Sequence, residues 1–350
     1  MSDLVRDSRL KTFFPPDPRQ GEVPILTARV FEESGQNPHE RLVQRKEVWK
    51  RERFIARGAY GSVWLEKCVK GARAQETRAV KQIMRSPQRA LGSKKVLDYD
   101  TELENFAKFS HRNACAYNRC FVQSFGWYEW ENALLIAMEY LPLGDMQDYL
   151  LESSRLSEPE GQQVTSQLLE GLLFMHRNGF MHRDLKPKNI LIRSKPPQPW
   201  WVKIGDFGIS RRADTEFSAT TAIQGTMGFL APELHGLVQP SSGRGRHILG
   251  ASDMWALGET VFRLLTSAAS FPTLRELISY AREETPFPAK PLLECGISEA
   301  GISFVRELLV VDPRKRATAD SRLEHEWILS QGASMEVSRP PSLLFSGLAT

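Results

Sequence analysis

The amino-acid sequence predicts an α+β protein with two lobes, a small antiparallel β lobe carrying one helix and a larger, mainly helical lobe. Alternating apolar and polar residues, typical of strands, dominate roughly the first 140 residues. Apolar residues at helical spacing dominate the chain after Gly144. The 350 residues allow one large domain or two small ones, and 41% hydrophobic with 25% charged residues is typical of a soluble globular protein.

Charge and cysteine content exclude several classes of protein. A formal net charge of +4 falls short of the concentrated basic excess of a nucleic-acid binder, so we expect no nucleic-acid partner. The first residues lack the apolar core of a secretory signal, and the longest apolar stretch, at 134–141, is interrupted by Glu139, so we expect no membrane segment. Four scattered cysteines do not form a disulfide framework. These features favour a reduced protein of the cytoplasm or nucleus.

Five strands and one helix are expected in the small lobe. The first strand begins near Val48, and the two strands of the last hairpin flank a turn at Glu131 and Asn132. Helical spacing over 97–109 places Leu103 and Phe106 on one apolar stripe. The other strands are expected over 62–65, 77–83, 121–130 and 133–139.

The large lobe is expected to pack around long helices. The stripe Val164, Leu168 and Leu172 indicates a helix with one face in the core. Helices are expected over 157–177, 252–265, 273–283, 298–309 and 318–329. The expected organisation is an N-terminal extension (1–47, partly disordered), a folded domain (small lobe 48–139, linker 139–144, large lobe 145–328) and a C-terminal tail (329–350).

Two features of the small lobe have the residue types of a phosphate-binding site. Gly58 and Gly61 lie between two strands, where glycines let the backbone approach a polyphosphate closely, although a hairpin uses glycines as well. Lys81 ends an apolar strand next to the small Ala79. The lysine could bridge phosphates while the alanine leaves room for a flat base; taken alone, however, Lys81 fits a surface lysine better.

The large lobe contains two polar loops that follow apolar segments. Residues 182–189 read His-Arg-Asp-Leu-Lys-Pro-Lys-Asn, which places Asp184, Lys186 and Asn189 at short, fixed spacing. Asp206 opens the sequence Asp-Phe-Gly after another apolar strand. Carboxylate and amide oxygens are the hard ligands and the base that magnesium-assisted phosphoryl transfer requires. The two loops therefore predict phosphoryl-transfer chemistry.

Together with Ala-Pro-Glu at 231–233, these motifs occur in the order of the protein-kinase signature set. From about residue 48 to 328 the chain resembles the eukaryotic-type protein kinase family. Lys186 followed by Pro187, and Gly225 followed by Thr226, are similar to the serine/threonine class. The resemblance implies the bilobal protein kinase fold and transfer of the γ-phosphate of Mg·ATP to Ser/Thr hydroxyls of protein substrates.

The resemblance also implies roles for the residues of both loops. Asp184 is expected to orient the acceptor hydroxyl and to accept its proton, and Lys186 to neutralise charge on the transferred phosphoryl group. Asn189 and Asp206 are expected to hold Mg²⁺.

Lys81 is expected to contact the α- and β-phosphates and to pair with Glu102 of the small-lobe helix. Glu104 competes for that pairing, but it points about 200° around the helix. The expected ATP-binding residues are Ile55, Gly58, Gly61, Val63, Ala79, Lys81, Glu102, Met138 (at the gatekeeper position), Glu139 and Leu141 (through their backbones), and Leu191 (below the base).

Supporting contacts follow from the same resemblance. Thr226 is expected to bond Asp184 and Lys186, Asp253 to brace the catalytic loop, and Glu233 to pair with Arg316. A phosphate added by an upstream activating kinase is expected to pair with Arg183 and order the segment 206–233. The candidate acceptors for that phosphate are Thr215, Ser218, Thr220 and Thr221.

The chain departs from the family pattern at Ala56, which replaces the first glycine of the phosphate loop. This departure keeps open a second hypothesis, a pseudokinase that binds nucleotide and acts as a scaffold. A small-molecule kinase would lack the segment 231–233 and the helices after it. The catalytic loop and the motif at Asp253 are similar to calcium/calmodulin-dependent and checkpoint-type kinases, but no basic amphipathic helix follows Ile328 to bind calmodulin.

Overall fold

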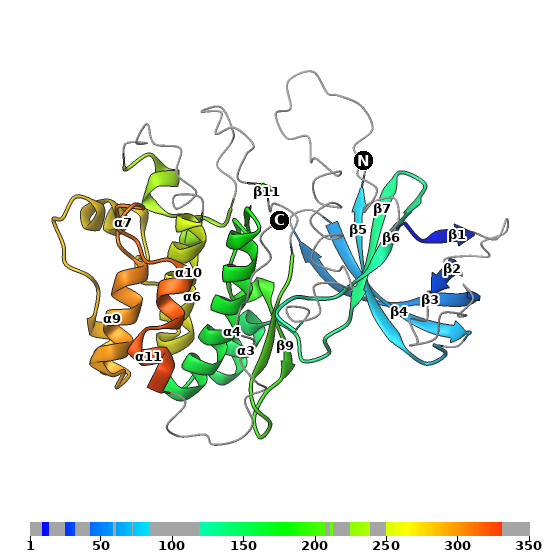
Figure 1. Cartoon of the computed structure of the whole chain (residues 1–350), viewed down its shortest axis with the longest axis horizontal. Helices are drawn as coiled ribbons and strands as arrows, with labels where there is room; N and C mark the ends of the chain where they lie inside the picture. Colours follow the sequence, from blue (N-terminus) through cyan, green and yellow to red (C-terminus); the bar gives the residue numbers. More distant parts are fainter. Residues whose placement is uncertain are drawn as a thin grey trace, which may run out of the picture.

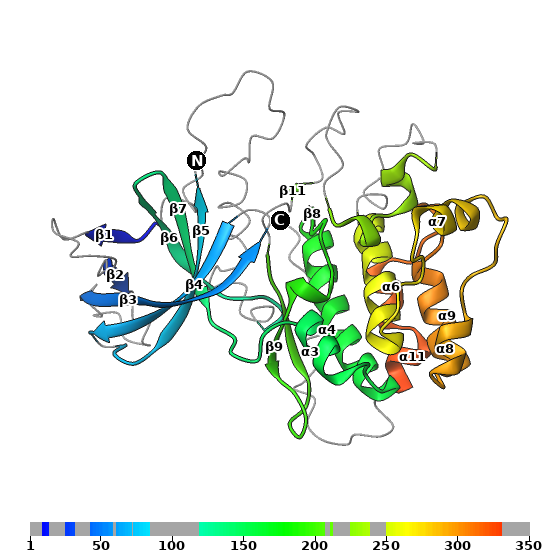
Figure 2. The same cartoon turned by 180° about the vertical axis from the view of Figure 1, so that it is seen from behind.

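The chain folds into the two lobes that its sequence predicts (Figures 1 and 2). A computed structural model describes residues 9–13, 25–31, 43–58, 61–71, 73–84, 119–206, 211–212, 225–238 and 250–330. Strands β1 to β7 gather at one end of the molecule and the helices at the other (Figure 1). Among the described residues, no helix is long and apolar enough to cross a membrane.

One seven-stranded antiparallel sheet forms the small lobe, in the order β1-β2-β3-β4-β5-β7-β6. Its strands are β1 (Lys11–Phe13), β2 (Ile25–Phe31), β3 (Val43–Gly58), β4 (Gly61–Lys70), β5 (Thr77–Met84), β6 (Ser124–Trp130) and β7 (Ala133–Glu139). The helix expected over 97–109 lies outside the described residues.

The sheet is larger than the sequence predicts. Strands β1 and β2 lie within the segment 1–47 that we assigned to an extension, and β3 begins at Val43 rather than near Val48. The seven-residue ladder between β2 and β3 adds these residues to the edge of the sheet. Residues 25–31 read Ile-Leu-Thr-Ala-Arg-Val-Phe and are rich in the β-branched and aromatic types that favour strands, a signal that the assignment to an extension overlooked.

Side chains on the two faces of the sheet belong to two separate cores. Ile83 of β5 packs in the main core, which continues into the large lobe, whereas Val80 belongs to a smaller cluster on the rear face. The rear face also buries an ion pair in which Arg78 donates to Glu66 at 2.8 Å while its guanidinium lies 4.1 Å from the ring centroid of Trp49. The charge of Arg78 is thus satisfied inside the lobe.

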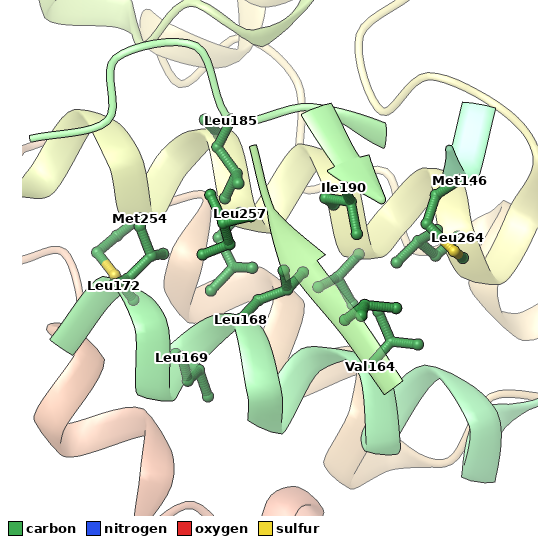
Figure 3. Packing of buried hydrophobic residues seen from close by; sticks show 14 of the residues in the cluster. Met146, Val164, Leu168, Leu169, Leu172, Leu185, Ile190, Met254, Leu257 and Leu264 are labelled. Carbon is green, nitrogen blue, oxygen red and sulfur yellow. The ribbon is translucent and has the colours of Figure 1, made fainter. Parts of the chain in front are cut away.

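The large lobe is built on two long helices, α4 (Glu158–Arg177) and α6 (Ala251–Thr266). Nearly every side chain of α6 is buried, which is typical of a central helix. In Figure 3, Leu168 and Leu172 of α4 face Leu257 and Met254 of α6, with Leu185 of the following loop above them. The loop 182–189 is therefore anchored in this core through Leu185.

The remaining helices are shorter. They are α3 (Met146–Ser153), α7 (Leu274–Ala281), α8 (Lys290–Glu294), α9 (Glu299–Leu308), α10 (Ala319–Leu323) and α11 (Glu326–Leu329). Helix α3 was not predicted. The prediction of a single helix over 318–329 is wrong. This segment is divided into α10 and α11, because His325 leaves the helical conformation and its side chain accepts a hydrogen bond from the backbone N–H of Trp327, as an N-cap does.

Short strands and one-turn helices position the loops between the lobes. They are β8 (Phe180–Met181), η2 (Pro187–Asn189), β9 (Ile190–Ser194), β10 (Trp201–Ile204), β11 (Arg211–Arg212), η3 (Met227–Phe229) and η4 (Pro232–His235). Strand β10 pairs with β9 and its backbone also bonds Cys120 and Val122. It approaches α4 closely at Gly171, where a Cβ would lie 2.7 Å from Cδ1 of Ile204.

Candidate active site

Asp184 lies at the centre of a hydrogen-bonded cluster between β8 and η2, and it is 9% exposed. Lys186 Nζ donates to Asp184 Oδ2 at 2.6 Å and to Thr226 Oγ1 at 2.6 Å. Thr226 in turn donates to Asp184 Oδ1 at 2.8 Å, which confirms the contacts expected for this threonine. Both carboxylate oxygens of Asp184 are thereby fixed in direction.

Asn189 completes the cluster from the last residue of η2. Its Nδ2 donates to the main-chain oxygen of Asp184 at 2.7 Å and to Oδ2 at 3.2 Å. Because the amide nitrogen faces Asp184, the amide oxygen of Asn189 points away from it and can act as a ligand. Among the described residues, no group of three His, Cys, Asp or Glu side chains could hold a metal by itself.

Asp253 holds the catalytic loop from the first turn of α6. It accepts backbone N–H bonds from His182 and Arg183, both at 2.8 Å, and a bond of 2.9 Å from His176 Nε2. Complete burial opposes ionisation of Asp253, but the bonds from His176 and from the Arg183 backbone outweigh it, so the pKa of Asp253 lies below its ordinary value. This is the bracing contact that the sequence predicts.

Two residues of the site have left-handed backbone conformations that side chains disfavour. Arg183 has a φ of 70° and Asp206 a φ of 57°. Such strain persists only where surrounding contacts over-determine it, and it concentrates at functional sites. Here the side chain of His182 bonds the carbonyl of Gly205 at 3.1 Å. His182 precedes Arg183, and Gly205 precedes Asp206. The two strained turns are therefore tied to one another.

Lys81 joins the lobes through an ion pair. Its Nζ lies 2.7 Å from Oδ1 of Asp206, and the lysine side chain is only 8% exposed. The pairing with Glu102 that we expected concerns a residue outside the described part of the chain. The structure thus brings the strand lysine to the aspartate of the Asp-Phe-Gly sequence, 125 residues away.

The expected ATP-binding residues of the small lobe occupy adjacent positions in the sheet. Val63 of β4 pairs with Lys81, and Ala79 of β5 pairs with Met138 of β7. Gly58 and Gly61 are paired residues that close the β3–β4 hairpin. Gly61 also has a packing requirement, because a Cβ there would lie 2.1 Å from the carbonyl oxygen of Gln82.

The other expected positions lie on three further parts of the chain. On β3, Ile55 is half-buried and Ala56 pairs with Val63. Leu141 is buried in the linker, and Leu191 lies on β9.

The linker carries an ion pair that sequence reasoning missed. Oε2 of Glu139 lies 2.6 Å from Nζ of Lys203, whose side chain is 7% exposed, and the backbone N–H of Glu139 donates to Gln123 at 2.8 Å. Strand β10 of the large lobe thereby holds the linker. The only local signal was a lysine inside the apolar run Trp-Val-Lys-Ile, which does not identify a partner.

The expected ion pair between Glu233 and Arg316 is present in the segment after Thr226. Arg316 forms two bonds to Glu233, at 2.7 and 2.8 Å, and its guanidinium is fully buried. Arg183 is half-buried, and the backbone of β11 pairs with β8 immediately before the catalytic loop. The candidate phosphate acceptors Thr215, Ser218, Thr220 and Thr221 lie outside the described residues.

Comparison with known proteins agrees with this geometry. A profile of the protein kinase domain matches residues 49–328. The chain therefore belongs to the protein kinase family, and within it to the eukaryotic-type serine/threonine kinases.

Several curated kinases are similar over most of this region. The serine/threonine-protein kinase cds1 of Schizosaccharomyces pombe is 34% identical over 226 residues, covering 63% of this chain and 47% of that protein. Mitogen-activated protein kinase kinase kinase 3 of Homo sapiens is 32% identical over 282 residues, covering 80% of this chain and 42% of that protein. The chain thus spans less than half the length of these relatives.

A solved structure shares the fold. The crystal structure of Rad53 residues 1–466 in complex with AMP-PNP superposes with a TM-score of 0.60 at 28% identity, covering 79% of this chain and 64% of that one. The predicted bilobal protein kinase fold is confirmed.

Proposed function

We propose that this chain transfers the γ-phosphate of Mg·ATP to serine or threonine hydroxyls of protein substrates. The observation that carries this proposal is the cluster in which Lys186 and Thr226 fix both carboxylate oxygens of Asp184. A solvated surface aspartate does not require such a cluster. A general base does, because its carboxylate must be oriented toward the hydroxyl from which it accepts the proton. The similarity of the chain to the serine/threonine-protein kinase cds1 and to mitogen-activated protein kinase kinase kinase 3 supports the same activity.

The residues divide the reaction between them. Asp184 orients the acceptor hydroxyl, whose oxygen forms a bond to the γ-phosphorus as the bond between that phosphorus and the β–γ bridging oxygen breaks. The hydroxyl proton passes to Asp184, and ADP leaves with the bridging oxygen. Lys186 lies 2.6 Å from Asp184 and can stabilise the negative charge of the phosphoryl group during transfer.

Lys81 and Asp206 are suited to bind the polyphosphate and its metal. The ammonium group of Lys81 is nearly buried and would contact the α- and β-phosphates, and the Asp206 carboxylate and the Asn189 amide oxygen would hold Mg²⁺. Two side chains alone do not fill the coordination sphere of Mg²⁺, so phosphate oxygens and water would complete it. When bound, Mg²⁺ neutralises phosphate charge.

The test is phosphate transfer from radiolabelled Mg·ATP to a generic acceptor protein such as casein. Asp184→Asn and Lys81→Met are expected to abolish transfer. Their matched controls are Asp320→Asn and Lys290→Met, at side chains that are 66% and 85% exposed, and these controls should retain full activity. Mg·ATP binding without transfer by the wild type, even after treatment with an activating kinase, would instead support the pseudokinase scaffold.

We also propose regulation by phosphorylation, which is supported by the position of Arg183 between His182 and Asp184. A phosphate on one of Thr215, Ser218, Thr220 or Thr221 would pair with Arg183 and order the segment before Thr226. Protein from a kinase-free host is expected to gain activity as it becomes phosphorylated. Full activity of the unphosphorylated protein would contradict this.

A further inference from the structure

Residues 9–13 contact both edges of the small-lobe sheet. At one end, β1 pairs with β2, the neighbour of β3. At the other end, Arg9 forms a parallel bridge with Trp127 of β6, and the backbone N–H of Leu10 donates to the Trp127 carbonyl at 2.7 Å. Because β1 and β6 are the two edge strands, this bridge links the two edges of the sheet and closes it at one point. Figure 1 shows β1 leading away from the side of β6, with β2 beside it.

Side chains anchor this closing segment (residues 9–13) to β6. Arg9 Nη2 lies 2.8 Å from Oε2 of Glu129, and its guanidinium lies 5.2 Å from the ring centroid of Trp127. Leu10 is 8% exposed and belongs to the rear-face cluster. The other buried members of this cluster are Val80, Tyr128, Ala133, Leu135 and Ala137.

The bridge is made at one particular row of the sheet. Trp127 pairs with Ile136, Ile136 with Lys81, and Lys81 with Val63. The closing segment therefore attaches to the outer end of the row that carries Lys81. The rear-face cluster also contains Val80, which precedes Lys81 on β5 and points to the opposite face. Leu10 is thus linked to Lys81 in two ways, through the main chain of the row that carries Lys81 and through the rear-face cluster behind it.

We propose that Leu10 is a positioning residue for the nucleotide, acting through β5 and Lys81. Without its side chain, the rear-face cluster loses its cover at the edge of the sheet, and the row that holds Lys81 is free to shift relative to Asp206. Small shifts of a binding group weaken the contacts that depend on its position. Because this role requires Lys81 to bind ATP, it rests on the proposed function.

The test is the affinity of the full chain for Mg·ATP, measured by calorimetry, together with separate kcat and KM values. Leu10→Ala is expected to raise the Kd for Mg·ATP on the order of tenfold, less than the roughly hundredfold that a 1 Å misplacement can cost. The KM for the acceptor protein should not change. Leu10→Met, which restores the apolar contact, should return the Kd to within about twofold of wild type.

A matched control separates positioning from loss of stability. Leu292 is fully buried in the large-lobe core, on α8, so Leu292→Ala is expected to lower the melting temperature without changing the Kd for Mg·ATP. An equal rise in Kd for Leu10→Ala and Leu292→Ala, or no rise for Leu10→Ala, would overturn the positioning role.

Should Leu10→Ala fail to fold, Arg9→Ala and Glu129→Gln each remove the ion pair at the same bridge while leaving Leu10 in place. Both variants should also raise the Kd for Mg·ATP, but by less than Leu10→Ala does. An unchanged Kd in both variants would overturn the positioning role of Leu10. A wild type that binds no Mg·ATP would overturn the proposed function first.

Discussion

Thr226 and Asp184, 42 residues apart in the sequence, share a hydrogen bond of 2.8 Å in which the threonine hydroxyl donates to the carboxylate. The same hydroxyl accepts from Lys186 at 2.6 Å. Thr226 thus holds the carboxylate of Asp184, the proposed base, and the ammonium group of Lys186 in one geometry.

Removing this hydroxyl should slow the chemical step. A hydrogen bond to a charged group contributes about 1.5–3 kcal/mol, so Thr226→Ala is expected to lower kcat by roughly 10- to 100-fold. Thr226→Ser keeps the hydroxyl and should retain most activity, while the KM for ATP should change little in both variants. Steady-state kinetics check this, and equal losses for both variants would contradict the role of the hydroxyl.

Gly225 sets the direction of Thr226. It has a φ of 133°, and a Cβ there would lie 2.7 Å from Leu230 and 3.2 Å from the Arg183 carbonyl. Gly225→Ala is therefore expected to displace Thr226 and to lower kcat at least as far as Thr226→Ala does. Gly236 also has a positive φ, 71°, but nothing lies within 4 Å of its Cβ position. Gly236→Ala should cost only about 1–2 kcal/mol of stability and leave kcat unchanged.

The ion pair between the buried Arg316 and the half-buried Glu233 is expected to stabilise the large lobe, and loss of either partner should destabilise it. Arg316→Met would leave the Glu233 carboxylate without its bonds, and breaking a buried pair costs about 3–5 kcal/mol. The exposed pair of Arg177 and Asp320 is the control, since Arg177→Met should cost about 0–1 kcal/mol. Urea denaturation of both variants measures the difference, and similar midpoints would show that burial is unimportant here.

Stability should fall in mildly acidic solution, in part through His235. Burial lowers the pKa of His235, and the nearby charge of Glu233 only partly opposes this. The unfolded chain therefore binds a proton at His235 more readily than the folded protein, and the stability present above about pH 6.5 is lost as the pH falls through the lowered folded-state pKa. Urea denaturation at about pH 7.5 and 5.5 should show a smaller loss for His235→Gln than for wild type. Equal losses would exclude His235.

Much of the site could be predicted because its groups are close in sequence or belong to recognisable motifs. Asp184, Lys186 and Asn189 lie within one loop and one turn of helix, so their spacing already determines that they meet. The long-range bonds of Thr226, Asp253 and Arg316 were predicted from the resemblance to kinases, and each is confirmed by a hydrogen bond.

Other features depend on contacts that leave no local trace. The apolar spacing over 318–329 predicts one helix, but the side chain of His325 caps a second one and divides it. Lys203 looks like any strand lysine until the fold places it 2.6 Å from Glu139.

The sequence by itself determined the two-lobed class and the long helices, because periodicity encodes them, and its motifs identified the residues of the catalytic loop through the resemblance to kinases. Only the tertiary structure decided that Lys81 meets Asp206, that β10 holds the linker, and that residues 9–13 close the small-lobe sheet. Leu10 and Val80 are 70 positions apart, and neither residue's neighbours indicate the other. Their association results from burying apolar surface shared by distant strands, which depends on how the whole chain packs.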